Sequence, residues 1–187
     1  NTKLKWKIND KNTLFVSGYF GADVMNLGFG ASESTEDKSS NQAANFQWNN
    51  ATATLRWNHL FTNKLFMNLS GIYSQYNYGL MFKTDSGKSS NNNQELFDWA
   101  SKVENWIFKP DFTFYKSAGT KFRFGTHLTL YRFKPTEVLS VEDNMNRVNF
   151  DTENGVEIAP YFEYEKEWVK WKLNAGLRYS WFGSLGP

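Results

Sequence analysis

The acidic pair Glu163 and Glu165 is the part of the sequence that comes closest to a catalytic arrangement. These residues stand two positions apart, so both carboxylates lie on one face if the segment is a strand. Paired carboxylates suit acid–base chemistry. Lys172 and Arg178 follow in the next segment, however, and are expected to pair with the carboxylates across a hairpin. A structural charge network is therefore favoured over catalysis.

Other chemistry finds no support in the sequence. The chain has two histidines and no cysteine, which excludes disulfides, thiolate metal sites and a cysteine nucleophile. His59 and His127 lie in different predicted hairpins, and His59 is expected to point outward near a turn, so no shared metal site is predicted. Segment 86–90, SGKSS, lacks the first glycine of a phosphate-binding loop because Phe82 occupies that position. We predict no enzymatic activity, no cofactor and no metal.

The composition indicates a chain whose aromatic residues lie at an interface. Aromatic residues make up 18% of the 187 residues, yet the mean hydropathy is −0.62. This combination is typical of the aromatic girdles of membrane barrels. The net charge of +2 gives no sign of nucleic-acid binding, and the apolar runs are too short for a transmembrane helix.

Strict alternation of apolar and polar residues predicts the elements that position these groups. Segment 171–181, WKLNAGLRYSW, alternates almost without fault, and the same pattern recurs along the chain. We predict a single all-β unit over 1–187, an antiparallel up-and-down transmembrane β-barrel sheet of about eight strands. Short turns are expected near 9–12, 62–64, 116–119 and 168–170, and long loops near 24–44, 84–95 and 135–154.

The two faces of these strands differ in charge. One face carries nearly no charge along the middle of each strand and is expected to meet lipid. The other is expected to line a wet lumen with a charge network of Arg56, Arg123, Glu157, Glu163, Glu165, Lys172 and Arg178. Aromatic residues fall near both strand ends, which predicts two girdles. The band near the long loops comprises Trp48, Tyr76, Tyr78, Phe82, Phe97, Trp99, Phe133, Trp181 and Phe182.

Two finer predictions concern particular segments. Segments 30–42 and 84–95 are expected to be extracellular and without regular structure, because they hold too few apolar residues to offset their ordering entropy. In the last hairpin, Glu165 is expected near Lys172, Glu163 beside Asn174, and Arg178 near Glu157 and Tyr161.

Three segments resemble hairpins of TonB-dependent outer-membrane receptors, above all the nutrient receptors of Bacteroidetes. They are YFEYEKEWVKWKLNAGLRYSWFGSLG (161–186), FRFGTHLTLYRFKP (122–135) and LRWNHLFTNKLFMNLSGIYSQYNY (55–78). The resemblance implies a segment, towards the C-terminus, of a 22-stranded barrel in the outer membrane of a Gram-negative bacterium. It also implies a plug domain and a TonB box, which this sequence lacks, and contact with TonB and a surface lipoprotein through parts of the receptor not present here.

The resemblance further implies TonB-dependent uptake of a nutrient ligand such as an oligosaccharide, a peptide or a chelated metal. The ligand-binding residues would be Trp48, Tyr76, Tyr78, Trp99, Tyr131 and Arg132, and stacking on the aromatic members of this set suits a sugar or another flat, polar ligand. Two alternatives stay open. One is a complete eight-stranded outer-membrane barrel with an adhesion or structural role, closed by pairing of 3–8 with 171–182. The other is a soluble β-sandwich that binds carbohydrate.

Overall fold

The computed structural model describes residues 1–30, 41–85, 94–140 and 146–187, and these residues form strands and no helix. All ten strands belong to one antiparallel sheet. They are β1 (Thr2–Asn9), β2 (Asn12–Gly30), β3 (Asn41–Thr62), β4 (Leu65–Asp85), β5 (Gln94–Ser117), β6 (Thr120–Ser140), β7 (Asn146–Asn149), β8 (Glu153–Glu167), β9 (Lys172–Arg178) and β10 (Trp181–Gly186).

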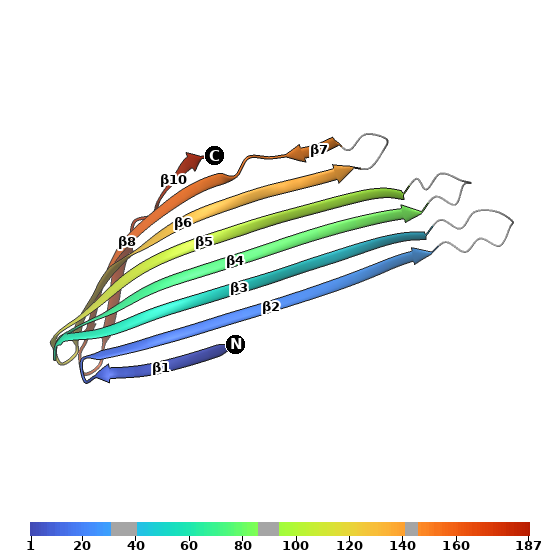
Figure 1. The fold of residues 1–187 in the computed structure, drawn as a ribbon. Helices are drawn as coiled ribbons and strands as arrows, with labels where there is room; N and C mark the ends of the chain where they lie inside the picture. The colour runs from blue at the N-terminus through green and yellow to red at the C-terminus, as the bar shows by residue number, and fades with distance from the viewer. Residues whose placement is uncertain (31–40, 86–93, 141–145) are drawn as a thin grey trace.

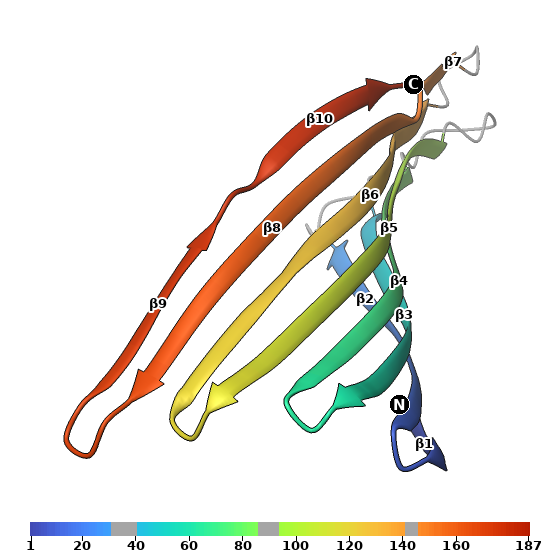
Figure 2. The same cartoon turned by 90° about the vertical axis from the view of Figure 1, so that its left-hand side faces the viewer.

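Strands that follow one another in the sequence lie side by side. The order across the sheet is β1-β2-β3-β4-β5-β6-β8-β10, with β7 beside β6 and β9 beside β8. The short turns gather at one end, here called the turn end, and the opposite end is called the far end (Figure 1). The sheet is twisted and curved, and its two edges are β1 and the β9–β10 side (Figure 2). This confirms the predicted all-β, antiparallel, up-and-down arrangement.

Local side-chain chemistry explains the sharp turns. The amide oxygen of Asn9 accepts hydrogen bonds from the backbone N–H of Lys11 and the side chain of Asn12. The hydroxyl of Thr62 accepts in the same way from the backbone of the β3–β4 turn. In the first turn, Lys7 donates a hydrogen bond to Asp10 at 2.6 Å, and this bond lowers the pKa of the Asp10 carboxyl. Gly119 closes the β5–β6 turn with φ 75°, a conformation that side chains disfavour.

The sheet has no second layer against it among the described residues. The buried apolar side chains there are Ala44, Met67 and Ala159, whereas large apolar side chains stay exposed along nearly every strand. A β-sandwich buries one face of each sheet against the other. The described residues form one sheet only, so the sandwich alternative is not what this structure contains.

Several expected boundaries differ from the structure. Strands enter all three segments predicted as long loops, 24–44, 84–95 and 135–154. Strand β2 continues to Gly30 and β3 begins at Asn41, β4 continues to Asp85 and β5 begins at Gln94, and parts of β6, β7 and β8 lie in the third segment. Asparagine and serine favour loops in the sequence, but here they stand in strands whose partners hold them by backbone pairing. Residues 31–40, 86–93 and 141–145 lie outside the described part, and with them most of segments 30–42 and 84–95.

The edges of the sheet also bear on the small-barrel alternative. Within the described residues β1 pairs with β2, and β9 and β10 pair with β8, so 3–8 and 171–182 do not pair with each other. Strand β10 continues the ladder of β9, because the backbone N–H of Tyr179 donates to the carbonyl oxygen of Pro160 between them. The sheet is therefore open.

Candidate functional site

The strand registers divide the side chains into two faces, since residues paired across strands point the same way. We call the face that carries Arg123 and Glu163 the charged face, and the face that carries Leu128 and Leu130 the apolar face. Arg123 pairs with Glu163 and Leu128 with Ile158 in the same β6–β8 ladder. All seven residues of the predicted lumen network fall on the charged face by these registers.

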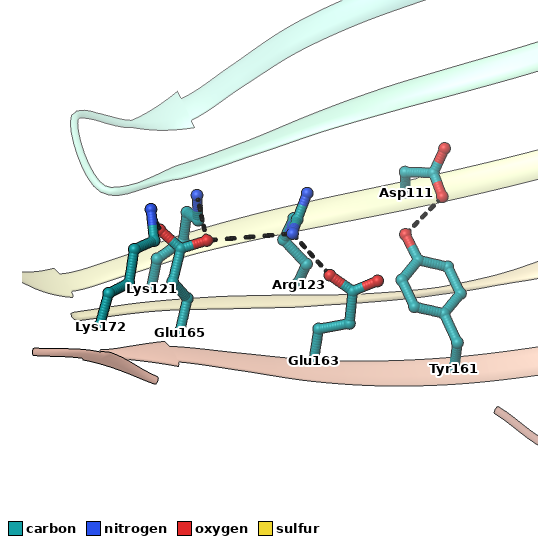
Figure 3. A network of polar contacts seen from close by, with 7 residues as sticks. All are labelled: Asp111, Lys121, Arg123, Tyr161, Glu163, Glu165 and Lys172. Atoms are coloured by element: carbon teal, nitrogen blue, oxygen red, sulfur yellow. Dashed lines mark hydrogen bonds and ion pairs between the residues drawn. The ribbon is translucent and has the colours of Figure 1, made fainter. Parts of the chain in front are cut away.

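Near the turn end, three strands contribute to one ion-pair network on the charged face (Figure 3). Arg123 on β6 lies 2.7 Å from Glu163 on β8. Glu165 is held between Lys121 and Lys172, each at 3.0 Å, and is 3.9 Å from Arg123. Each carboxylate therefore has at least one cation partner, as a structural charge network requires.

The predicted register of the last hairpin is partly correct. Lys172 and Glu165 form the expected ion pair, and Arg178 lies opposite Tyr161. Asn174, however, lies opposite Glu165, and the partner of Glu163 is Gly176. The turn between β8 and β9 spans four residues, 168–171, and each residue added to a turn moves the strand register.

Next to the network, Tyr161 crosses over a glycine to reach a strand that it does not pair with. Its hydroxyl donates a hydrogen bond of 2.6 Å to Asp111 on β5, although β6 lies between β5 and β8 (Figure 3). Gly125 of β6 stands between the two residues in both registers. A Cβ at this position would lie 2.3 Å from the carbonyl oxygen of Pro110 and 3.0 Å from the Tyr161 ring. Glycine is therefore required here by space.

A hollow of about 900 Å³ lies on the charged face, and its lining includes Asp111, Arg123, Tyr161 and Glu163. Arg178 and His127 also border it, with 3.3 Å between Nη2 of Arg178 and Nδ1 of His127. Of the remaining predicted network members, Glu157 accepts a hydrogen bond of 2.7 Å from Tyr131. Arg56 pairs in register with Ser70 and makes no ion pair among the described residues. The hollow suits water and hydrated polar solutes.

The apolar face begins at the turn end with a band of aromatic rings. Phe112 and Phe124 stack at 5.3 Å, and Phe114 and Phe122 at 6.3 Å. Further along the sheet, Trp57 donates to the amide oxygen of Asn12 at 3.0 Å, and His59 lies 2.7 Å from the same atom. His59 therefore stands on the apolar face near a turn, as predicted, and far from His127 in the sheet order.

Beyond this band each strand presents a short apolar stretch that ends at polar residues. On β6 the stretch runs from Phe122 to Leu130 and meets Arg132. On the neighbouring β5 it runs from Phe114 to Trp106 and meets Glu104. At this upper limit, the rings of Tyr73 and Trp106 lie 4.6 Å apart, and the Tyr73 hydroxyl donates to Glu104 at 2.9 Å.

Towards the far end the two faces exchange character. The apolar face becomes polar, with amide contacts between Asn26 and Asn45 and, at 2.6 Å, between Asn77 and Asn49. The charged face becomes aromatic. We call this part the aromatic surface; its described members include Tyr19, Phe46, Trp48, Tyr76, Tyr78, Phe82, Trp99, Tyr131, Phe133 and Phe182.

Five of the six predicted ligand-binding residues belong to the aromatic surface. Tyr78 and Trp99 contact edge to face at 6.4 Å, and Tyr131 stacks on Phe133 at 5.7 Å. Trp48 pairs in register with Tyr78, and Tyr76 stands two residues away on the same face. Arg132 lies on the opposite face, where its register partners are Glu104 and Asn154.

The expected aromatic girdle near the long loops needs correction. Most of its described members, among them Trp48, Tyr78 and Phe133, lie on the charged face and not on the apolar face. The predicted girdle groups residues by how close they are to the end of a strand. The face on which a residue lies depends instead on whether its position in the strand is odd or even. The aromatic residues that mark the upper limit of the apolar face are Tyr73 and Trp106, which are register partners.

The described residues hold no helix able to cross a membrane, and they bring together no group of three or more metal-binding side chains. Comparison of the chain with protein-family models, curated proteins and solved structures finds no match.

Proposed function

We propose that this chain is part of the wall of an outer-membrane β-barrel receptor that takes up a nutrient ligand. The observation that carries the proposal is the exchange of character along the strands. An apolar face that is limited at both ends by aromatic and polar residues fits a hydrocarbon layer. The stretch from Phe122 to Leu130 is close to the roughly 9–11 residues that a tilted strand needs to cross it.

The exposure of the apolar face supports lipid as its surroundings. Leu177 is 84% exposed, Trp106 60% and Phe162 49%. Contiguous apolar patches larger than several hundred Å² are rare on soluble monomers. Contact of apolar side chains with water costs free energy. In a membrane, hydrocarbon chains take the place of water around this face, and that cost is absent.

The open edges fit a wall segment better than a complete small barrel. An unpaired strand edge leaves backbone N–H and C=O groups without partners, which costs several kcal/mol per group in hydrocarbon. In the proposed receptor, β1 and the β9–β10 side pair with further strands of a larger barrel. No observation in the described residues favours closure of these two edges on each other.

The inner surface supports uptake of a ligand. In the proposed barrel the charged face lines the lumen, with the aromatic surface towards the outside of the cell and the ion-pair network towards the periplasm. Ring faces such as those of Trp99 and Tyr131 bind sugars and other flat, polar molecules by stacking and hydrogen bonding. The dependence on TonB rests on the resemblance of segments 55–78, 122–135 and 161–186 to that receptor family.

Uptake by living cells tests this function. Cells that produce the intact protein are given labelled oligosaccharides, peptides and metal chelates, with and without a protonophore. We expect uptake of one class, and we expect both the protonophore and deletion of TonB to abolish it. Replacement of Tyr78 and Trp99 by alanine should reduce uptake, whereas the control Trp106→Ala, on the apolar face, should not. If neither the protonophore nor deletion of TonB reduces uptake, the proposal of a TonB-dependent transporter is contradicted, and a passive or structural barrel is the remaining interpretation.

A further inference from the structure

Two lysines face each other on the apolar face directly above its apolar stretch. Lys102 on β5 and Lys134 on β6 are register partners. Like charges opposite each other destabilise a strand pair unless something neutralises them. Lys102 lies 2.8 Å from Glu104, whose carboxylate also accepts the Tyr73 hydrogen bond. Lys134 makes no ion pair within the described part of the chain, and Arg132 adds a third cation on this face. The cluster keeps an excess of positive charge.

A hollow that is lined by both polar and apolar side chains adjoins the two lysines. It has a volume of about 590 Å³, and its lining includes Asn49, Asn77, Lys102 and Lys134. The register of β5 and β6 shifts at this point, between Ala100 and Lys102, which indicates a bulge. Bulges re-aim side chains and are common beside binding sites. Ammonium and amide N–H donors around one hollow are suited to a phosphate group.

An apolar groove lies below the lysine pair on the same face. It has a volume of about 480 Å³ and is lined by side chains that include Leu55, Tyr73, Trp106, Phe108 and Leu130. Gly71 leaves its floor open, because a Cβ there would meet no atom within 4 Å. The Tyr73–Trp106 ring pair stands between the groove and Glu104.

The two hollows match the two ends of one lipid molecule. From Phe108 to Lys102 the strand extends roughly 20 Å, at about 3.3 Å per residue, which is roughly 14 Å along the membrane normal for a strand tilted by about 45° and so lies within one leaflet. One leaflet, with its headgroups, accounts for about half of a bilayer of roughly 40–45 Å. We propose that the outer surface of β3–β6 binds one phosphorylated lipid, with its phosphate between Lys102 and Lys134 and an acyl chain in the groove at Gly71. This site rests on the membrane placement proposed above.

Lipid retention measured by native mass spectrometry tests the site. The protein is purified from the membrane in a neutral detergent and offered phosphatidic acid or diacylglycerol with the same acyl chains, which differ only in the phosphate. We expect the wild type to retain phosphatidic acid about tenfold more than diacylglycerol, as a charge-assisted contact of ordinary strength requires. The double variant Lys102→Gln, Lys134→Gln should lose this preference. The matched control Lys3→Gln, Lys5→Gln, with the same change in charge on the charged face, should keep it.

A second variant separates the lipid from free phosphate. Gly71→Leu fills the groove and leaves the lysines unchanged. It should therefore lower retention of phosphatidic acid several-fold without affecting the binding of inorganic phosphate. If inorganic phosphate displaces phosphatidic acid from the wild type mole for mole, the site binds free phosphate and the lipid assignment is wrong. Equal retention of both lipids by the wild type, or equal behaviour of the two double variants, also overturns the site. Gly71→Leu tests the groove independently, even if the lysine variant does not fold.

The membrane placement is tested separately by alkaline extraction of whole membranes. Release of the wild type into the soluble fraction contradicts the proposed function. Retention in the membrane together with equal retention of the two lipids contradicts only the lipid site.

Discussion

Leu177 and Arg178 are neighbours in the sequence whose side chains lie on opposite faces of the sheet. Leu177 pairs with Phe162 on the apolar face, and Arg178 pairs with Tyr161 on the charged face. In the proposed barrel, Leu177→Arg places a charge in hydrocarbon, which costs about 2–4 kcal/mol near the bilayer centre. Arg178→Leu should change the free energy of unfolding far less. Urea unfolding in lipid vesicles measures both variants.

The exposure of Leu177 makes this pair of variants decisive. A side chain that is 84% exposed would tolerate arginine if water surrounded it, since surface substitutions usually stay within about 0.5 kcal/mol. Equal, small effects of the two substitutions would therefore contradict the membrane placement.

Gly125 should resist substitution because of the close approach of Tyr161. Gly125→Ala brings a Cβ to within 2.3 Å of the Pro110 oxygen, so the backbone or the Tyr161 ring must move. We expect a loss of about 1–3 kcal/mol in the free energy of unfolding, the usual range for overpacking. Gly71→Ala is the matched control, since its Cβ meets nothing. A loss no larger for Gly125→Ala than for Gly71→Ala would show that the crossing contact is unimportant.

For single residues, the sequence predicts which face of the sheet a side chain occupies better than it predicts which other side chain it contacts. Alternation places all seven network residues on one side, because parity within a strand is a local property. It does not reveal that Asp111 is reached from β8, because that contact needs the side-chain gap at Gly125 of the intervening strand. The prediction that Tyr131 and Arg132 both bind the ligand places two adjacent residues on one surface, although adjacent residues of a strand point to opposite faces.

Among the elements, the β8–β9 hairpin offers a direct test of strand register. The structure pairs Glu165 with Asn174, whereas a shorter turn would pair Glu163 with Asn174. The chain has no cysteine, so introduced pairs can be read without interference. We expect the double variant Glu165→Cys, Asn174→Cys to form a disulfide on mild oxidation, because register partners lie about 4.5–5.5 Å apart. The matched pair Glu163→Cys, Asn174→Cys should not.

Gel mobility with and without reductant reports the two outcomes. Cross-linking of the second pair in preference to the first would show that the turn holds two residues fewer than the structure gives it.

The elements also show where sequence patterns stop being informative. Alternation identifies the middle of each strand, where apolar residues mark one face. It fails where both faces are polar or aromatic, as in β3 near Asn45 and Asn49, where the sequence predicts a loop or its margin. Backbone pairing with β2 and β4 holds these residues in the sheet, and the types of their side chains do not predict that pairing.

For the whole molecule, the open sheet could not be derived from the sequence. About eight alternating segments fit either a small closed barrel or part of a large one, and the difference depends on whether β1 meets the β9–β10 side. The exchange of character between the two faces is likewise hidden in the sequence. To see it, one must know which residues of neighbouring strands lie at the same level of the sheet and which face each occupies. That knowledge requires the strand registers.

The exchange of character can be measured along a single strand. On β6, Leu128, Leu130 and Lys134 share the apolar face, and Thr129 lies on the other. We propose to place a nitroxide label, one cysteine at a time, at these four positions in vesicles, a design that the cysteine-free chain permits. Oxygen concentrates in hydrocarbon and should relax the labels at 128 and 130 most. A water-soluble nickel complex should relax the label at 134, because that position lies above the apolar stretch and faces water. Position 129 should show little response to oxygen, since it is buried on the opposite face.

A soluble sheet predicts a different profile, in which the nickel complex reaches 128, 130 and 134 alike. That profile would remove the reason for placing this sheet in a membrane.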